Sequence, residues 1–284
     1  MPAADRALVE QAPAKVNLTL RLLGRRADGY HDLESLVVFA AEADELKLFP
    51  GEPLALQVDG PTATAAGDVA DNLVLKVARG LSERVAGLTT GRFVLTKRLP
   101  VAAGLGGGSA DAAAALRLLA RVNSLALDDA RLIEVAGLTG ADVPVCLDPR
   151  PRLMRGIGEV LSPVSLPTFY VALAFPQVAV PTADIFRAPE LTRATPSAKM
   201  DVFSEGYGRN DLAPVTASRF PAVAATLQAL SRASPQARMT GSGACVFATF
   251  PALSEAQHAL TLLPQQVGGC VARTLAQHPL RAFA

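Results

Sequence analysis

The sequence predicts a two-lobed protein of the α+β class, in which each lobe combines α and β structure. Its 284 residues fit one large or two modest domains, because domains typically hold about 100 to 200 residues. Short strand patterns dominate the first third of the chain, and strand and helix patterns mix in the second half. Prolines become frequent near residue 150, so we expect an N-terminal lobe over residues 1–152 and a C-terminal lobe over residues 153–284.

The composition indicates a folded protein with no strong global charge. Hydrophobic residues make up 50% of the chain and charged residues 19%, which supplies a sizeable core. The 27 basic and 26 acidic side chains nearly cancel, which gives no electrostatic argument for binding nucleic acid or a membrane surface. Near-zero net charge leaves self-association open, and we expect a monomer or a weak homodimer.

Cysteine usage and hydropathy predict a cytoplasmic protein. Cys146, Cys245 and Cys270 have no close spacing, so we expect buried free thiols rather than a disulfide framework or a metal site. The N-terminal residues are charged without an apolar run, and no apolar stretch approaches the roughly 18 residues of a membrane span. We therefore expect no membrane contact.

The first strand pattern places polar side chains on one face. Residues 15–22 alternate strictly, with Lys15, Asn17 and Thr19 on one face and apolar residues on the other. A helix is predicted over residues 71–85, because apolar residues recur at helical spacing after an Asp-Asn pair suited to capping. Further strands are predicted over residues 36–41, 45–49, 54–58 and 92–97.

A glycine-rich segment joins the last of these strands to a helix predicted over residues 109–122. A second helix follows, capped by Asp128 or Asp129 and ending near Gly137. In the second half, the patterns predict strands over residues 169–175, 244–250 and 270–275 and helices over residues 218–231 and 254–263.

The segment GLGGGS, from Gly104 to Ser109, has the chemistry of an anion site. The first N–H groups of a helix have no partner within the helix, and the aligned peptide dipoles make that end partly positive. Glycines let phosphate oxygens approach the backbone, and Ser109 is placed to cap the helix or to reach a phosphate or Mg²⁺. Alternatively, the glycines only turn the chain. Neither the P-loop pattern GxxxxGK[ST] nor a Rossmann pattern fits the segment.

A second glycine run, Gly241-Ser242-Gly243, precedes the strand predicted over residues 244–250. Alone, such a run is most often a tight turn at the start of a strand. Paired with the first glycine segment, it can form the other side of an anion pocket.

Lys15 and Asp142 are the candidate catalytic pair. Each lies among apolar neighbours, in APAKVNL and GADVPV, although a solvated lysine and a capping or surface aspartate are the ordinary interpretations. If folding brings them together, the ammonium holds the carboxylate ionised, and the pair can activate a substrate hydroxyl for attack on a phosphoryl group. Tyr30, His31 and Phe186 follow loop segments, where their rings can stack on a nucleobase or simply pack.

Nine motifs, taken together and in order, resemble those of the GHMP kinase superfamily. They cover residues 12 to about 275: APAKVNL, RRADGYHDLES, DNL, KRLPVAAGLGGGSADAA, GADVPV, RGIGE, VPTADIF, NDL and GSGACVF. Within the superfamily, RADGYH and GADVPV are similar to the branch that phosphorylates a cytidine-diphosphate alcohol of the non-mevalonate isoprenoid pathway. The resemblance implies a two-lobed GHMP kinase fold, with ATP and substrate in a cleft between the lobes and phosphoryl transfer from ATP to a hydroxyl group.

Matching the motifs residue by residue implies the roles of individual side chains. Lys15 and Asp142 match the catalytic pair, and Asn17 matches a substrate-positioning residue. The ATP-binding positions are Pro100, Gly104, Leu105, Gly106, Gly107, Gly108 and Ser109 around the phosphates and Asn72, Leu73 and Lys97 on the adenosine side. The remaining substrate-binding positions are Tyr30, His31, Thr182, Phe186, Gly241, Ser242 and Gly243, with rings stacking on cytosine and His31 hydrogen-bonding to it. The resemblance implies no separate metal site, since Mg²⁺ enters with ATP and Ser109 is its candidate protein ligand.

Two positions depart from the family's pattern. Ala102 and Ala103 stand where further glycines often precede the Gly-Leu pair, which leaves the phosphate-facing part intact. Ala110 and Asp111 stand where Ser-Asn is common. A carboxylate at this point can repel the triphosphate or recruit Mg²⁺, so Asp111 is left out of the predicted site.

Two alternative functions remain open at this level. One is a kinase of the homoserine or mevalonate type, against which Tyr30, His31 and Phe186 argue, because those substrates carry no base to stack. The other is a catalytically silent nucleotide-binding protein, against which the intact Lys15 and Asp142 argue.

Overall fold

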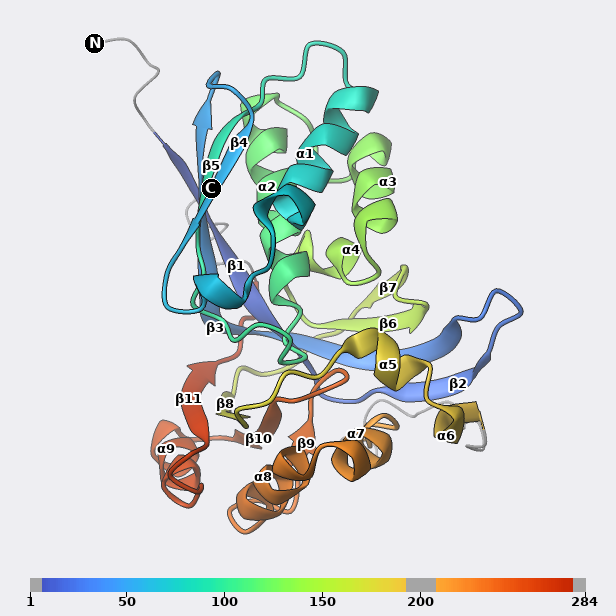
Figure 1. Ribbon diagram of the computed structural model, residues 1–284, viewed down its shortest axis with the longest axis vertical. Coiled ribbons are helices and arrows are strands. Elements are labelled where there is room, and N and C mark those ends of the chain that lie inside the picture. The colour runs from blue at the N-terminus through green and yellow to red at the C-terminus, as the bar shows by residue number, and fades with distance from the viewer. Residues whose placement is uncertain (1–6, 193–207, 278–284) are drawn as a thin grey trace.

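Two β-sheets, each accompanied by helices, form the two lobes of the computed structural model, which describes residues 7–192 and 208–277 (Figure 1). In this part of the chain the first sheet has seven strands: β1 (Leu8–Asn17), β2 (Arg21–Arg25), β3 (His31–Pro50), β4 (Ala55–Asp59), β5 (Gly91–Thr96), β6 (Arg152–Gly156) and β7 (Val160–Pro163). The second sheet has four: β8 (Tyr170–Phe175), β9 (Arg238–Met239), β10 (Val246–Phe250) and β11 (Gly268–Arg273). The α+β class predicted from the sequence is confirmed.

The long strand β3 organises the first sheet. It pairs antiparallel with β1 and β2 and, over its two halves, with β5 and β6, while β4 lies parallel to β5. The sequence analysis divided β3 into strands over residues 36–41 and 45–49. That division is wrong, because no glycine or proline lies between His31 and Phe49 to turn the chain.

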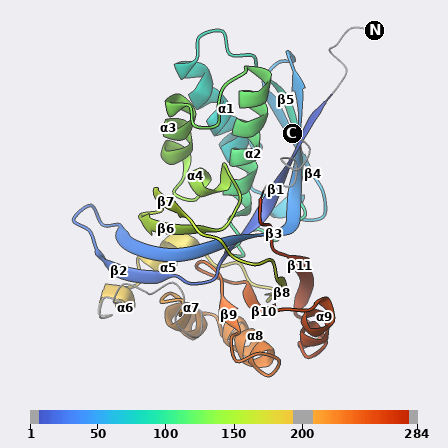
Figure 2. The same ribbon diagram turned by 180° about the vertical axis from the view of Figure 1, so that it is seen from behind.

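Helices cover one side of the first sheet, as Figures 1 and 2 show from opposite directions. They are α1 (Leu73–Arg84), α2 (Gly107–Val122), α3 (Ala130–Thr139) and α4 (Val143–Cys146). Asn72 caps α1, as predicted from the Asp-Asn pair, and Asp129 rather than Asp128 caps α3. A run of four fully buried alanines in α2, residues 112–115, allows this helix to pack closely within the lobe.

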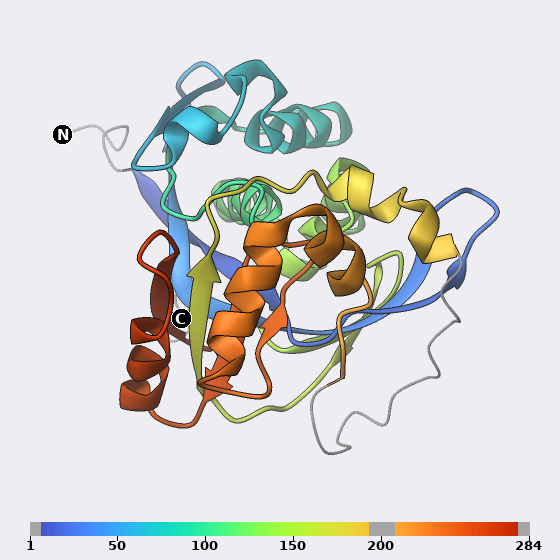
Figure 3. The same cartoon turned by 60° about the horizontal axis from the view of Figure 1, so that its bottom comes forward.

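The second lobe carries α5 (Thr182–Phe186), α6 (Pro189–Thr192), α7 (Ala213–Arg219), α8 (Pro221–Ser231) and α9 (Leu253–Thr261). Figure 3 shows α8 and α9 lying against the second sheet. The helix predicted over residues 218–231 is interrupted, because Pro221 cannot continue a helix and moves Phe220 out of helical geometry. None of the described helices has the length and apolar character needed to cross a membrane.

A shared core joins the two sheets. Val16 and Val38 from the first sheet pack in one buried cluster with Leu173 and Phe247 from the second. Leu105, within the glycine segment, is buried in the same cluster, so this segment is anchored in the core rather than lying free on the surface.

The sheet pairing corrects the expected lobe boundary at residues 152 and 153. Residues 152–156 form β6, which pairs with β3, and β7 extends the same sheet to Pro163. The second sheet begins at Tyr170. The prolines near residue 150 therefore precede the boundary between the lobes. The hairpin of β6 and β7 still belongs to the first lobe.

The strand predicted over residues 15–22 is also interrupted. β1 ends at Asn17, and the hydroxyl of Thr19 accepts the backbone N–H of Leu36 at 2.9 Å in place of a regular ladder bond. The chain then resumes pairing in β2, from Arg21 onward.

Candidate active site

A cleft of about 490 Å³ opens where the two lobes meet, and most of the predicted site residues line it. From the first lobe these are Lys15, Asn17, Asn72, Leu73, Lys97, Pro100, Gly104, Leu105, Gly106, Gly107, Gly108, Ser109 and Asp142. Segments around the second sheet add Thr182, Phe186, Gly241 and Ser242. The predicted residues outside this lining are Tyr30, His31 and Gly243.

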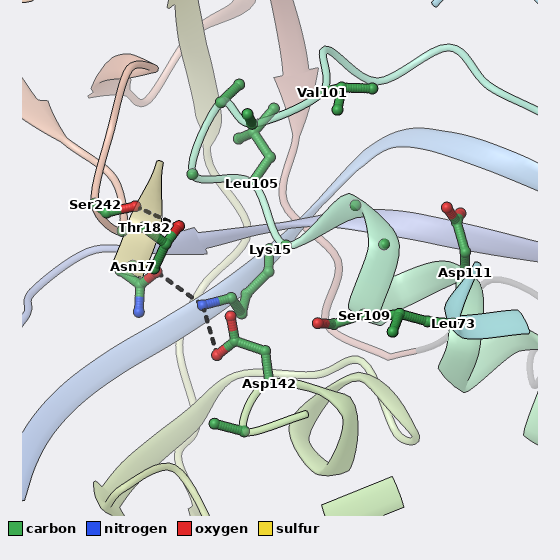
Figure 4. Close-up of a pocket in the computed structure, with 18 of the residues that line it drawn as sticks. Lys15, Asn17, Leu73, Val101, Leu105, Ser109, Asp111, Asp142, Thr182 and Ser242 are labelled. Atoms are coloured by element: carbon green, nitrogen blue, oxygen red, sulfur yellow. Dashed lines mark hydrogen bonds and ion pairs between the residues drawn. The ribbon is translucent and has the colours of Figure 1, made fainter. Parts of the chain in front are cut away.

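Lys15 and Asp142 meet inside the cleft. The Lys15 ammonium lies 3.1 Å from the Asp142 carboxylate and donates a 2.9 Å hydrogen bond to the Asn17 amide oxygen (Figure 4). Lys15 is buried, whereas the Asp142 side chain is 35% exposed. The carboxylate is therefore held beside a cation and still open to a substrate hydroxyl.

The local fold explains this meeting. Residues two apart on β1 share a face, which places Lys15 and Asn17 side by side. Asp142 is the residue that precedes α4, and its side chain makes no capping bond to that helix, so the carboxylate is free to face Lys15.

Hydrogen bonds fix the orientation of Asn17. Its amide nitrogen donates to the Ser35 hydroxyl at 2.7 Å, and its backbone N–H donates to the Thr240 hydroxyl at 2.9 Å. The amide oxygen is thereby directed at Lys15. The sequence analysis missed Ser35 and Thr240, because single hydroxyls within strand and turn patterns carry no distinctive spacing.

The glycine segment forms an uncapped helix start. α2 begins at Gly107, two residues before the predicted start, and no side chain caps its end. Gly106 has a left-handed backbone with φ of +65°, a conformation that favours glycine. Ser109 is therefore the third helical residue. It does not cap the helix, which was one of the two roles predicted for it; the other was to reach a phosphate or Mg²⁺. The first backbone N–H groups of α2 face the cleft as a potential anion cradle.

Both sheets hold this segment in place. The Lys15 N–H donates to the Leu105 carbonyl at 2.8 Å, and the Cys245 N–H donates to the Ala103 carbonyl at 2.9 Å. At Gly104, a Cβ atom would collide with the carbonyl oxygens of Thr240 and Gly243. The two glycine runs thus lie against each other, and glycine is required for that approach.

Side chains support the second glycine run. Asn210, from the NDL motif, donates its amide N–H to the carbonyls of Gly241 and Met239, each at 2.8 Å. The hydroxyls of Thr182 and Ser242 lie 2.9 Å apart at the edge of the cleft (Figure 4). The role of Asn210, like those of Ser35 and Thr240, was not revealed by the sequence alone.

A second charged cluster lies beneath the glycine segment. The Lys97 ammonium donates to Asp44 at 2.5 Å and to Asp111 at 2.7 Å, and all three side chains are buried. The other oxygen of Asp44 accepts the backbone N–H groups of Arg98 and Leu99. Figure 4 shows the Asp111 carboxylate at the far side of the helix start, turned away from Lys15.

The electrostatics of this cluster are unusual. Burial raises the pKa of Asp111 to about 7, although the adjacent Lys97 charge opposes the increase. Burial would lower the pKa of Lys97, but the two carboxylates outweigh it and raise that pKa. One oxygen of the Asp111 carboxylate is therefore already hydrogen-bonded to Lys97.

The predicted nucleobase residues are only partly brought together. The rings of His31 and Phe186 have centroids 6.0 Å apart and an interplanar angle of 44°. Burial, and secondarily the Arg25 charge, lowers the pKa of His31, which favours the neutral imidazole. Tyr30 is 60% exposed in the turn before β3, and like His31 it lies outside the lining of the cleft.

The fold and the site together define a small-molecule kinase of the GHMP type. Models of the GHMP kinases N-terminal domain and C-terminal domain match residues 72–148 and 193–266. A protein of Xanthobacter autotrophicus named 4-diphosphocytidyl-2-C-methyl-D-erythritol kinase is 54% identical over 93% of this chain and 97% of its own length. A Rhodopseudomonas palustris protein of the same name is 53% identical over 86% of this chain and 88% of its own. The chain belongs to the 4-diphosphocytidyl-2-C-methyl-D-erythritol kinase family.

Solved structures agree with this assignment. A crystal structure of a 4-(cytidine 5'-diphospho)-2C-methyl-D-erythritol kinase matches 94% of this chain with a TM-score of 0.80 and 30% identity, over 99% of its own chain. A homoserine kinase from Cytophaga hutchinsonii shares the fold, with a TM-score of 0.65 and 18% identity over 98% of this chain and 97% of its own. The resemblance to the GHMP kinases that the sequence motifs indicated is confirmed.

Proposed function

We propose that this protein transfers the γ-phosphoryl group of ATP to the 2-hydroxyl of 4-diphosphocytidyl-2-C-methyl-D-erythritol, giving ADP and the 2-phosphate. This reaction belongs to the non-mevalonate (MEP) route to isoprenoid precursors. The observation that carries the proposal is the 3.1 Å pair of Lys15 and Asp142 beside an uncapped helix start in one cleft. The expected oligomeric state, a monomer or a weak homodimer, remains part of the proposal.

The glycine segment is the proposed donor site. Backbone N–H groups at the start of α2 would bind the phosphate oxygens and neutralise the charge that develops on them during transfer. Cβ atoms at Gly106 and Gly107 would lie 3.0 Å from the Lys15 Cε and 3.4 Å from the Lys97 Nζ, so glycine lets this segment pack closely against both lysines. Pro100 and Leu105 also line the cleft and would border the phosphates, and Asn72, Leu73 and Lys97, which line it too, would face the nucleoside.

Magnesium would enter with ATP. This ion prefers oxygen ligands and retains several waters, so phosphate oxygens and water would supply most of its ligands. Ser109, which lines the cleft in the first turn of α2, is the side chain best placed to add a hydroxyl oxygen. Bound in this way, the ion would offset negative charge on the transferred group.

Lys15, Asp142 and Asn17 are the proposed reaction centre. Asp142 would accept or orient the proton of the 2-hydroxyl, while the Lys15 ammonium stabilises the carboxylate and the developing alkoxide. The hydroxyl oxygen then bonds to the γ-phosphorus, and the bond from that phosphorus to the bridging oxygen of ADP breaks. Asn17 would fix the position of Lys15 relative to the substrate, because its amide oxygen accepts a hydrogen bond from the ammonium.

The cytidine site is proposed where Phe186, in the lining of the cleft, meets His31 just outside it. The rings of Phe186 and His31 would pack against cytosine, with the neutral His31 imidazole contributing hydrogen bonds. Tyr30 would reach the base only by moving from its exposed position. Thr182, Gly241, Ser242 and Gly243 would contact the diphosphate and the polyol.

The function is tested by measuring ADP release with MgATP and a panel of cytidylylated, amino-acid and mevalonate-type alcohols. We expect release with the cytidylylated alcohol and none above background with the others. A preference for homoserine or mevalonate would overturn the substrate assignment. Absence of release with every alcohol would instead favour a silent nucleotide-binding protein.

The role of Asp142 is tested in the same assay with Asp142→Asn. Turnover should fall by about 100-fold or more, since general-base and orienting contributions are typically that large, while ATP binding changes little. Asp128→Asn, which alters an exposed carboxylate outside the cleft, is the matched control and should retain full turnover. Near-normal turnover of Asp142→Asn would refute the assignment.

A further inference from the structure

The guanidinium of Arg117, on α2, is buried and contacts two other elements. Its Nε donates to the Glu10 carboxylate at 3.0 Å, and one terminal nitrogen donates to the Gln11 carbonyl at 2.7 Å, both on β1. The other terminal nitrogen donates to the Cys146 carbonyl of α4 at 2.7 Å. Only 6% of the Arg117 surface is exposed. The side chain therefore joins three separate elements within the lobe.

These three elements carry the parts of the proposed reaction centre. β1 continues from Gln11 to Lys15, and α4 begins immediately after Asp142 and ends at Cys146. α2 begins with the glycine segment. Arg117 itself lies outside the lining of the cleft, so it reaches the reaction only through these elements.

Asp142 depends on such support because its own helix is short. α4 has four residues, and a helix of that length is not stable without tertiary contacts. The Asp142 side chain makes no capping bond that would fix it to α4. Its position relative to Lys15 is therefore set by where α4 packs, and the bond from Arg117 to the Cys146 carbonyl fixes the far end of that helix.

We propose that Arg117 is a positioning residue that sets the separation of Lys15 and Asp142 by fastening α4 to β1. The proposal rests on the role assigned above to this pair. A planar guanidinium can satisfy a carboxylate and two carbonyls at once, which the single ammonium of lysine cannot do in the same geometry. Without it, α4 is released at one end, and a shift of about 1 Å in a reacting group is sufficient to slow a reaction substantially.

The test is a double-mutant cycle on the single-turnover rate with enzyme in excess over substrate. Arg117→Met should lower this rate about tenfold, with the KM for ATP changed less than twofold, because the glycine segment is fastened separately by Lys15 and Cys245. Arg117→Lys should lose less, about threefold. In an Asp142→Asn background, Arg117→Met should change the remaining rate less than twofold, because the group it positions is gone.

The matched control is Arg84→Met on α1. Arg84 also donates to a carboxylate, that of Glu134 at 2.9 Å, and to a carbonyl, that of Gly80 at 3.0 Å, but it lies outside the cleft. Its replacement should leave the single-turnover rate within twofold of the parent. Arg84 and Glu134 are 26% and 56% exposed, so the control measures what loss of an arginine with similar bonds costs at a more exposed place, without displacement of α4.

A rate for Arg117→Met within twofold of the parent would overturn the proposal, as would an equal loss in the parent and Asp142→Asn backgrounds. If Arg117→Met does not fold, the same cycle with Arg117→Lys decides the question. Failure of the role proposed for Asp142 is separately visible, because Asp142→Asn alone would then retain normal turnover, and failure of the proposed function would appear as no ADP release with the cytidylylated alcohol.

Discussion

Two clusters of lysine and aspartate in the first lobe use the same side chains for different purposes. In both, the lysine is almost fully buried, at 4% side-chain exposure for Lys15 and 5% for Lys97. The carboxylates differ, since Asp142 is 35% exposed whereas Asp44 and Asp111 are 0% and 3% exposed. A carboxylate held by lysine and open to the cleft can meet a substrate. A carboxylate buried against lysine acts first on the fold, even where, as with Asp111, the residue also borders the cleft.

The buried cluster holds in place the residues that immediately precede the glycine segment. Lys97 connects Asp44 of β3 to Asp111 of α2, and Asp44 also accepts the N–H groups of residues 98 and 99, just before the segment begins. The cleft pair has no such network around its carboxylate. We therefore expect substitutions in the buried cluster to change stability first and substitutions in the cleft pair to change turnover first.

The strongest test of this difference is Lys97→Met. It would leave two carboxylates buried with no countercharge, and breaking a buried ion pair typically costs about 3 to 5 kcal/mol. We expect the free energy of unfolding, measured in denaturant, to fall by that amount. A loss below about 1 kcal/mol, the range of an exposed pair, would mean that the cluster is not a structural one.

The reciprocal substitution, Lys15→Met, should affect turnover instead. Loss of the ammonium removes the cation proposed to stabilise the carboxylate and the alkoxide, so kcat should fall about 100-fold. The free energy of unfolding should change by about 1 kcal/mol or less, because the partly exposed Asp142 remains hydrated. A large loss of stability with retained turnover would reverse the comparison between the two clusters.

The sequence predicted the cleft pair but not the buried cluster, and the reason is physical. Lys15 and Asp142 each lie in a recognisable motif, and alternation on β1 placed Asn17 beside Lys15. Asp44 lies in an ordinary strand pattern 53 residues from Lys97, and nothing in local spacing relates the two. The sequence analysis therefore left Asp111 between repelling the triphosphate and recruiting Mg²⁺, whereas the structure pairs it with Lys97.

The same distinction applies to the fold. Helix periodicity and capping predicted α1, α2 and α3 to within a few residues, because these signals are local. The continuous β3 and the placement of β6 and β7 in the first sheet arise from pairing between distant segments. Single-sequence patterns do not specify such pairing.

A smaller effect is expected where the glycine segment touches the cleft pair. A Cβ added at Gly106 would lie 3.0 Å from the Lys15 Cε, so Gly106→Ala should displace this side chain and reduce kcat about tenfold. The left-handed backbone adds about 1 to 2 kcal/mol of strain. Gly87→Ala is the matched control. Gly87 has a similar φ of +72°, and nothing lies within 4 Å of an added Cβ, so this variant should lose stability but keep its turnover. Equal kcat losses in both variants would assign the effect to strain alone.

The smallest expected effect is a change with pH in the stability that Asp111, in the buried cluster, gives to the fold. The pKa of Asp111, raised to about 7 mainly by burial, lies above its usual value of 3.8, so between these values the folded protein binds more protons than the unfolded chain. This group therefore stabilises the fold least at high pH, and its contribution declines as the pH rises toward 7. Asp111→Asn removes the titration while keeping an oxygen for Lys97.

The difference in Tm, variant minus parent, should accordingly shift in favour of Asp111→Asn as the pH rises from 5 to 8. Contributions from other titrating groups, His31 among them, are common to both proteins and cancel in the difference. Asp128→Asn, at an exposed position, should show a difference that does not depend on pH. If Asp111→Asn behaves in the same way, the buried carboxylate does not titrate in this range.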